Sequence, residues 1–193
     1  EANYTGGASG TLVILDVFAL AVTGDNGTVT GGGQHVEGTT ATLEAGPAPG
    51  YVFAAWSGDA SGTDNPLSIL MDSDKTISAT FEPDLADDDN DGLTNYQEIV
   101  VLGTNPALAD TDDDGRGDAA DAFPLNPDEW VDTDGDGTGN NADQDDDDDG
   151  VPDADELFEG TNPLLADTDG DGLTDGAEVA EHHTNPTAKQ NAG

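Results

Sequence analysis

The chain repeats one short pattern five times: Asp-x-Asp-x-Asp-Gly, with Asp or Glu six residues after the glycine. The copies begin at Asp87, Asp110, Asp132, Asp145 and Asp167. Each copy fits a twelve-residue calcium loop, in which positions 1, 3 and 5 carry side-chain oxygens, position 6 is glycine and position 12 closes the shell. Acidic composition alone does not explain five copies that keep both the glycine and the closing carboxylate. The sequence therefore predicts an array of calcium loops.

The predicted ligands occupy positions 1, 3, 5, 7, 9 and 12 of each loop, with position 7 acting through its backbone carbonyl. In chain order they are Asp87, Asp89, Asp91, Leu93, Asn95 and Glu98; Asp110, Asp112, Asp114, Arg116, Asp118 and Asp121; Asp132, Asp134, Asp136, Thr138, Asn140 and Asp143; Asp145, Asp147, Asp149, Val151, Asp153 and Glu156; and Asp167, Asp169, Asp171, Leu173, Asp175 and Glu178.

Net charge points to the same kind of site. The chain of 193 residues carries 43 acids and a formal charge of −40, and 33 of the acids lie from Asp84 onward. Such a composition is typical of disorder unless bound cations provide the missing folding free energy. Calcium suits six or seven flexible oxygens better than magnesium does, and no loop offers the His or Cys that zinc prefers. We expect five or more Ca²⁺ ions, with Asp113, Asp146 and Asp148 available for extra sites.

Several partners are excluded or disfavoured by composition. Cysteine is absent, so neither disulfides nor thiolate sites form. Phosphate would be repelled by so acidic a chain, which argues against nucleic acid, and no stretch has the length of a membrane span. Weak calcium sites fill at the calcium concentrations found outside cells. We therefore expect a secreted protein, extracellular or at the cell surface.

The composition changes near residues 81–84. Before this point apolar and polar residues alternate along short runs separated by Gly, Pro and Asn turns, which predicts about six short strands. The expected fold class is mainly β, with a small antiparallel β-domain followed by an irregular, calcium-stabilised repeat rod with short helices. The expected boundaries are an N-terminal tail at 1–17, the β-domain at 18–82, the repeats at 84–186 and a tail at 187–193.

The β-domain carries a recognisable motif. The run Phe-Ala-Ala-Trp-Ser-Gly-Asp at 53–59 precedes Asn-Pro at 65–66 and Asp-Lys-Thr-Ile-Ser-Ala-Thr-Phe at 74–81. In these segments the chain resembles the divergent internalin-type B-repeats of bacterial surface proteins, over about residues 18–82. The resemblance implies a spacer or adhesive module, and we expect Trp56 to be a core or rim aromatic.

The apolar run at residues 12–22 leaves two alternatives open. Its continuous apolarity suits a strand covered on both faces. One interpretation is a long central strand of its own domain. The other is a strand donated to a neighbouring copy of the chain, with the preceding glycines as a hinge.

The loops are joined by segments that are not regular helices. Thr-Asn-Pro at 104–106 and 161–163 leads into loops two and five, and proline there excludes an incoming helix. Short helices are expected to leave some loops, with Tyr96, Ile99 and Val100 on one face and Gly103 as a stop. Loop starts are 23, 22, 13 and 22 residues apart. With the linkers at 123–127 and 129–137, residues 84–186 resemble bacterial thrombospondin type 3 repeats. The resemblance implies a rod wound around calcium ions, ending at the third Thr-Asn-Pro, where His183 replaces the usual glycine.

No catalytic constellation is expected. The three histidines lie outside any recognisable nucleophile motif, and the acids are committed to the loops. The leading hypothesis is a secreted, non-catalytic structural protein acting as a stalk, spacer or adhesive module, with calcium, other copies of the chain or cell-surface components as partners. The alternatives are a self-assembling filament subunit that donates its N-terminal strand, and an accessory region of a larger secreted hydrolase.

Overall fold

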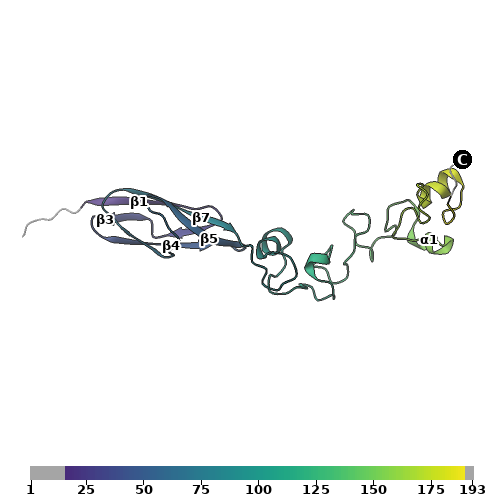
Figure 1. Cartoon of the computed structure of the whole chain (residues 1–193), viewed down its shortest axis with the longest axis horizontal. Coiled ribbons are helices and arrows are strands. Elements are labelled where there is room, and N and C mark those ends of the chain that lie inside the picture. Colours follow the sequence, from purple (N-terminus) through teal and green to yellow (C-terminus); the bar gives the residue numbers. More distant parts are fainter. Residues whose placement is uncertain (1–15, 190–193) are drawn as a thin grey trace, which may run out of the picture. The chain divides into compact units, whose positions relative to one another are not determined.

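The computed structural model describes residues 16–189 and separates the chain into two compact units, Glu1–Leu85 and Ala86–Gly193. The described part of the first unit is built from seven strands (Figure 1). They are β1 (Val17–Thr23), β2 (Gly27–Thr30), β3 (Gly33–Val36), β4 (Thr40–Pro47), β5 (Tyr51–Gly58), β6 (Leu67–Leu70) and β7 (Lys75–Pro83). The expected small β-domain is confirmed, with one strand more than the turn pattern indicated.

The strands form two sheets, ordered β3-β1-β7-β5 and β2-β4-β6. Most neighbours are antiparallel, as expected, including the long β5–β7 pair, whose register shifts between Phe53 and Ala55. The exception is β1, which runs parallel to β7 from Leu20 opposite Lys75 to Thr23 opposite Ser78. The domain is therefore rich in antiparallel pairs without being purely antiparallel.

Buried apolar residues alternate with exposed residues along the strands, and the buried ones form the core. On β4, Ala41, Leu43 and Ala45 are buried while the residues between them are exposed. Trp56 is 2% exposed, which confirms a core position, and its indole Nε1 donates a 2.8 Å hydrogen bond to the carbonyl oxygen of Asp64. The partner of the indole N–H lies within the domain, so the ring is buried without an unpaired donor.

The first strand differs from its sequence prediction. Its described part pairs with β3 on one edge and β7 on the other, as a strand of its own domain does. Burial on both faces is wrong for these residues, because Leu20 is buried while Val17 and Ala21 are exposed. One face covers the core and the other faces outward. Residues 12–15 of the apolar run lie outside the described residues.

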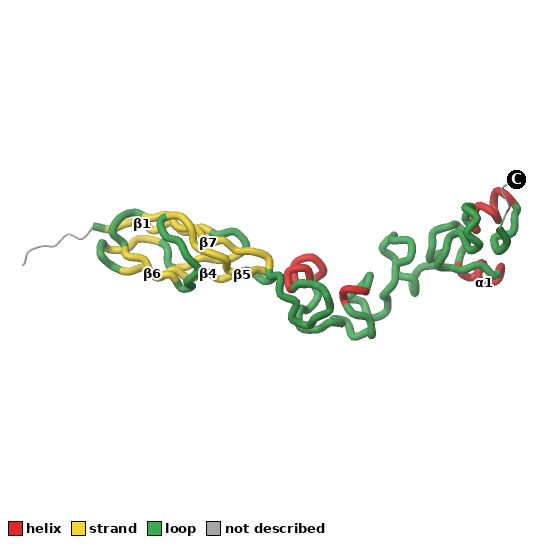
Figure 2. Tube along the Cα trace, in the orientation of Figure 1, coloured by secondary structure: helices red, strands yellow, loops and turns green. Residues whose placement is uncertain are grey.

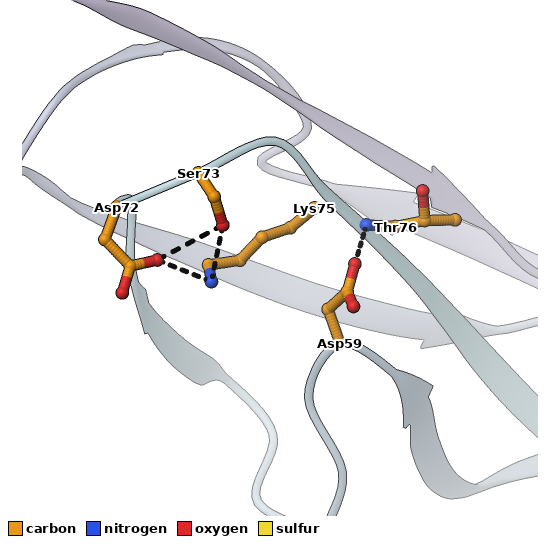
Figure 3. Close-up of polar contacts among 5 residues, drawn as sticks. All are labelled: Asp59, Asp72, Ser73, Lys75 and Thr76. Carbon is orange, nitrogen blue, oxygen red and sulfur yellow. Dashed lines mark hydrogen bonds and ion pairs between the residues drawn. The ribbon is translucent and has the colours of Figure 1, made fainter.

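Short polar contacts fix the entry into β7 (Figure 3). The carboxylate of Asp59 accepts a 2.7 Å hydrogen bond from the amide of Thr76, whose carbonyl in turn accepts one from the amide of Asp59. Lys75 forms a 2.7 Å ion pair with Asp72 and also contacts Ser73. The carboxylate side chain of Asp72 is 64% exposed, which limits the contribution of this ion pair to stability.

The second unit consists mainly of loops, with a few short helices between them (Figure 2). The helices are η1 (Gln97–Leu102), η2 (Asp118–Ala120), α1 (Asp153–Glu159), α2 (Asp175–Ala177) and η3 (Glu178–His182). Gly103, Gly160 and His183 end three of them in the left-handed conformation, with φ of 81°, 87° and 55°. The expected stop at Gly103 is confirmed. The expected apolar face is only partly correct, because Val100 is 44% exposed while Glu98 is fully buried.

Candidate metal centres

Each acidic loop is folded around the carboxylate at its position 1. In all five loops this carboxylate accepts the amide of the position 6 glycine, at 2.8–3.3 Å. The carboxylates at positions 3 and 5 accept the amides two residues ahead of them, at 2.9–3.3 Å and 2.6–3.1 Å. These turns use one oxygen of each side chain at position 3 and, at position 1, both oxygens in loops one, two, three and five. They direct the three carboxylates of a loop toward one another.

The result is five carboxylate triads. In each one, ligand atoms from positions 1, 3 and 5 lie within 4.8 Å of one another. The triads are Asp87, Asp89 and Asp91; Asp110, Asp112 and Asp114; Asp132, Asp134 and Asp136; Asp145, Asp147 and Asp149; and Asp167, Asp169 and Asp171. Hard carboxylate oxygens at this spacing suit a divalent cation with oxygen ligands.

Buried carboxylate oxygens without a hydrogen-bond partner show that the donor set fits a cation. In the first two loops, Oδ2 of Asp89, Asp91, Asp112 and Asp114 is buried and unpaired. A buried anion that lacks a partner is costly unless a counter-charge is present. Loop three is the exception, because Asp136 is exposed and no carboxylate oxygen of its triad is both buried and unpaired. It is the most open of the five candidate sites.

The closing glutamates are among the most buried groups in the chain. Glu98, Glu156 and Glu178 are each 0% exposed, and both carboxylate oxygens of Glu98 and Glu156 lack a hydrogen-bond partner. Burial, reinforced by the charges of Asp89 and Asp91, raises the pKa of Glu98 to about 7. Burial and the charge of Asp147 likewise raise the pKa of Glu156 to about 7, while the nearby Thr161 hydroxyl lowers it. Position 12 therefore lies beside its own triad in loops one and four, as the register predicts.

Position 9 does not join the triads. Its side-chain oxygen accepts the backbone amide of position 2 in loops two to five, at 2.7–3.1 Å, with Asp118, Asn140, Asp153 and Asp175 as the acceptors. Its own amide donates to the carbonyl just before position 1 in all five loops, at 2.8–3.0 Å. Position 9 thus closes each loop through these hydrogen bonds. Its role as a ligand of the ion in its own loop stays a prediction. The same is true of the position 7 carbonyls as ligands, in Leu93, Arg116, Thr138, Val151 and Leu173.

The threonine of Thr-Asn-Pro is a neighbour of the site that sequence reasoning missed. Thr184 Oγ1 donates a 2.7 Å hydrogen bond to Oε1 of Glu178, and its amide donates to the carbonyl of the same residue. Thr104 and Thr161 make the same backbone contact with Glu98 and Glu156, and both are buried. The signal available in the sequence was the constant spacing of this threonine, five or six residues after the closing glutamate.

Two glycines in loop five give different predictions. Gly172 at position 6 has φ of 100°, whereas Gly170 at position 4 has φ of 71°, where loops one and two carry Asn90 and Asp113. Asn tolerates the φ of 71° at position 4 far better than the φ of 100° at position 6. Gly172→Asn should therefore cost loop five about tenfold or more in calcium affinity through backbone strain of one or more kcal/mol. The matched change Gly170→Asn should leave the affinity nearly unchanged. Calorimetric calcium titration of both variants measures this, and equal losses would count against the register.

Among residues 16–189, no helix combines the length and apolarity needed to cross a membrane.

Comparison with known families agrees with both units. Residues 18–85 match the model described as "Divergent InlB B-repeat domain". Residues 87–109, 145–166 and 167–189 match the model described as "Bacterial TSP3 repeat". Comparisons with curated proteins and with solved structures gave no significant match. The chain therefore carries a divergent InlB B-repeat domain followed by bacterial TSP3 repeats, in the order that the sequence motifs predicted.

Proposed function

We propose that the chain is a secreted, non-catalytic structural protein in which a β-domain is followed by repeats made rigid by calcium. It serves as a stalk, spacer or adhesive module outside the cell. The observation that carries the proposal is the repetition of buried, unpaired carboxylate oxygens around the acidic triads. Bound cations offset buried like charges of this kind, and the TSP3 matches favour calcium.

In this proposal calcium supplies the folding free energy that an apolar core supplies elsewhere. Within the described residues of the second unit, Val151 and Pro186 are the only apolar side chains that are buried. Binding free energy then becomes folding free energy, because no ordered site exists in the extended chain. Each ion would be held by the three carboxylates of a triad and, in loops one, four and five, by the closing glutamate. Loop three, with the most exposed triad, would be the weakest site.

An extracellular location follows from the need for occupied sites. Sites of moderate affinity are filled where free calcium is high, which is the condition outside cells. A spacer needs rigidity and solubility, and the strongly negative surface favours solubility. The β-domain agrees with this role, since its core is closed by its own seven strands.

Distance measurements between two spin labels test the proposed rigidity. Because the chain has no cysteine, cysteines introduced at the exposed Leu108 and Leu164 can be labelled without side reactions. We expect a narrow distance distribution in millimolar calcium and a broad one after chelation. A pair within the β-domain, at the exposed Val17 and Leu70, should give the same distribution in both conditions. Equally broad distributions for the 108–164 pair in both conditions would contradict a calcium-held spacer.

A further inference from the structure

Loops four and five are joined by a hydrogen bond from a backbone amide of one loop to a side-chain carboxylate of the other. The amide of Gly176 in loop five donates a 2.7 Å hydrogen bond to Oδ2 of Asp149, which is position 5 of loop four. A Cβ at Gly176 would collide with the carbonyl oxygen of Asp149. The turn that contains Asp175 and Gly176 therefore packs tightly against the preceding loop.

This contact buries the carboxylate of Asp175 beside loop four. Asp175 is 1% exposed; its Oδ1 accepts the amide of Thr168, and its Oδ2 has no hydrogen-bond partner. Glu156, which closes loop four, is 0% exposed and is also unpaired. The charge of Asp175 is among the causes that raise the pKa of Glu156, after burial and Asp147. Two carboxylates from successive loops thus share one buried region.

Loops one and two repeat only part of the arrangement, because both carboxylate oxygens of Asp118 accept hydrogen bonds from Thr111. Asp118, position 9 of loop two, is 2% exposed, and its charge contributes to the raised pKa of Glu98, which closes loop one. These two loop pairs have start spacings of 23 and 22 residues. In these two pairs, position 9 of one loop lies beside position 12 of the loop before it.

We propose that Asp175 is a ligand of the cation held by loop four. This inference rests on the proposed calcium binding and deepens it. Oδ1 of Asp175 holds the amide of its own loop, which leaves Oδ2 for the preceding ion. A cation between Asp175 and Glu156 resolves the burial of two like charges, which would otherwise destabilise each other.

The shared ligand couples neighbouring repeats. Loop five must be folded for Asp175 to reach loop four, and the ion of loop four in turn holds Asp175 in place. Calcium binding to the two loops is therefore positively cooperative, and the coupling is reciprocal. Rigidity along the array then arises from the ions that bridge repeats as well as from the loops themselves.

The test is a calcium titration of the full chain followed by NMR at the amides of Gly150 and Gly172, which report loops four and five separately. Asp175→Asn keeps Oδ1 for Thr168 and removes the charged ligand. We expect it to raise the calcium midpoint at Gly150 by about tenfold or more, the usual scale for a lost charged ligand or its support. The matched variant Asp171→Asn changes the triad of loop five. It should raise the calcium midpoint at Gly172 more than the midpoint at Gly150.

A double-mutant cycle with Glu156→Gln provides the second measurement. If both carboxylates hold one ion, the loss at Gly150 in the double variant should be smaller than the product of the two single losses. A midpoint at Gly150 that Asp175→Asn leaves unchanged, or losses that multiply fully, would overturn the shared ligand while leaving calcium binding intact. If neither glycine of the wild-type chain responds to calcium, the proposed function itself fails.

Discussion

Removal of calcium is expected to unfold residues 86–189 and to leave residues 16–85 folded. The second unit holds most of the acids and almost no buried apolar side chain, so its carboxylates repel one another once the ions leave. The first unit contains no acidic triad within its described residues and has its own core around Leu43, Met71 and Ile77, each 0% exposed. Its stability should not depend on calcium.

NMR amide spectra of the isotopically labelled chain report the folding of both units in one experiment. After chelation, the amides of loops one to five should collapse to random-coil positions, while those of the β-domain should keep their dispersion. Excess calcium should restore the loop signals, and an equal concentration of magnesium should not, because magnesium requires a tighter octahedral site. Loop amides that keep their positions in excess chelator would contradict the dependence on metal.

Trp56→Ala is expected to have the largest effect of any single substitution in the β-domain. The indole is 2% exposed and packs against Phe53 with ring centroids 5.1 Å apart. Its loss leaves a cavity and an unpaired carbonyl at Asp64, which together should cost about 3–5 kcal/mol. A domain of this size has roughly 5–15 kcal/mol of stability in total, so the variant should be close to unfolding.

Urea denaturation followed by circular dichroism measures that loss. Trp130→Ala is the matched control, because Trp130 is 40% exposed and lies in the second unit; it should change the stability of the β-domain by less than about 0.5 kcal/mol. Calcium titration of Trp56→Ala should give loop affinities like those of the wild type, since the two units have separate sources of stability. A cost below about 1 kcal/mol would argue that Trp56 is not a core residue.

The elements that were predictable are those whose cause is local. On β4 and β7 the alternation of residues fixes which side chains are buried, and both strands appear where it indicated. Within the loops, the glycine at position 6 takes φ of 94–103° in all five copies. Loop geometry follows from hydrogen bonds between residues two to nine positions apart, so a sequence pattern is sufficient to predict it.

What the sequence did not reveal depends on contacts between segments. The outward face of β1 could not be inferred from an apolar run, because exposure depends on whether a second layer covers the strand. After loop one, an apolar helix face was expected, yet Glu98 is the buried residue, since the helix packs its carboxylate toward the triad instead of toward a core. The approach of Asp175 to loop four arises from packing between repeats, and spacing alone does not specify it.

Counting the bound ions tests directly whether the five acidic loops bind calcium. Native mass spectrometry of the full chain, exchanged into a volatile buffer with free calcium near saturation, gives the number of ions from the mass increments. We expect five or more calcium ions, with one fewer when Asp87, Asp110, Asp145 or Asp167, the first residue of a loop, is changed to Asn. A chain that retains no calcium, or that keeps the same number of ions in all of these variants, would contradict this expectation.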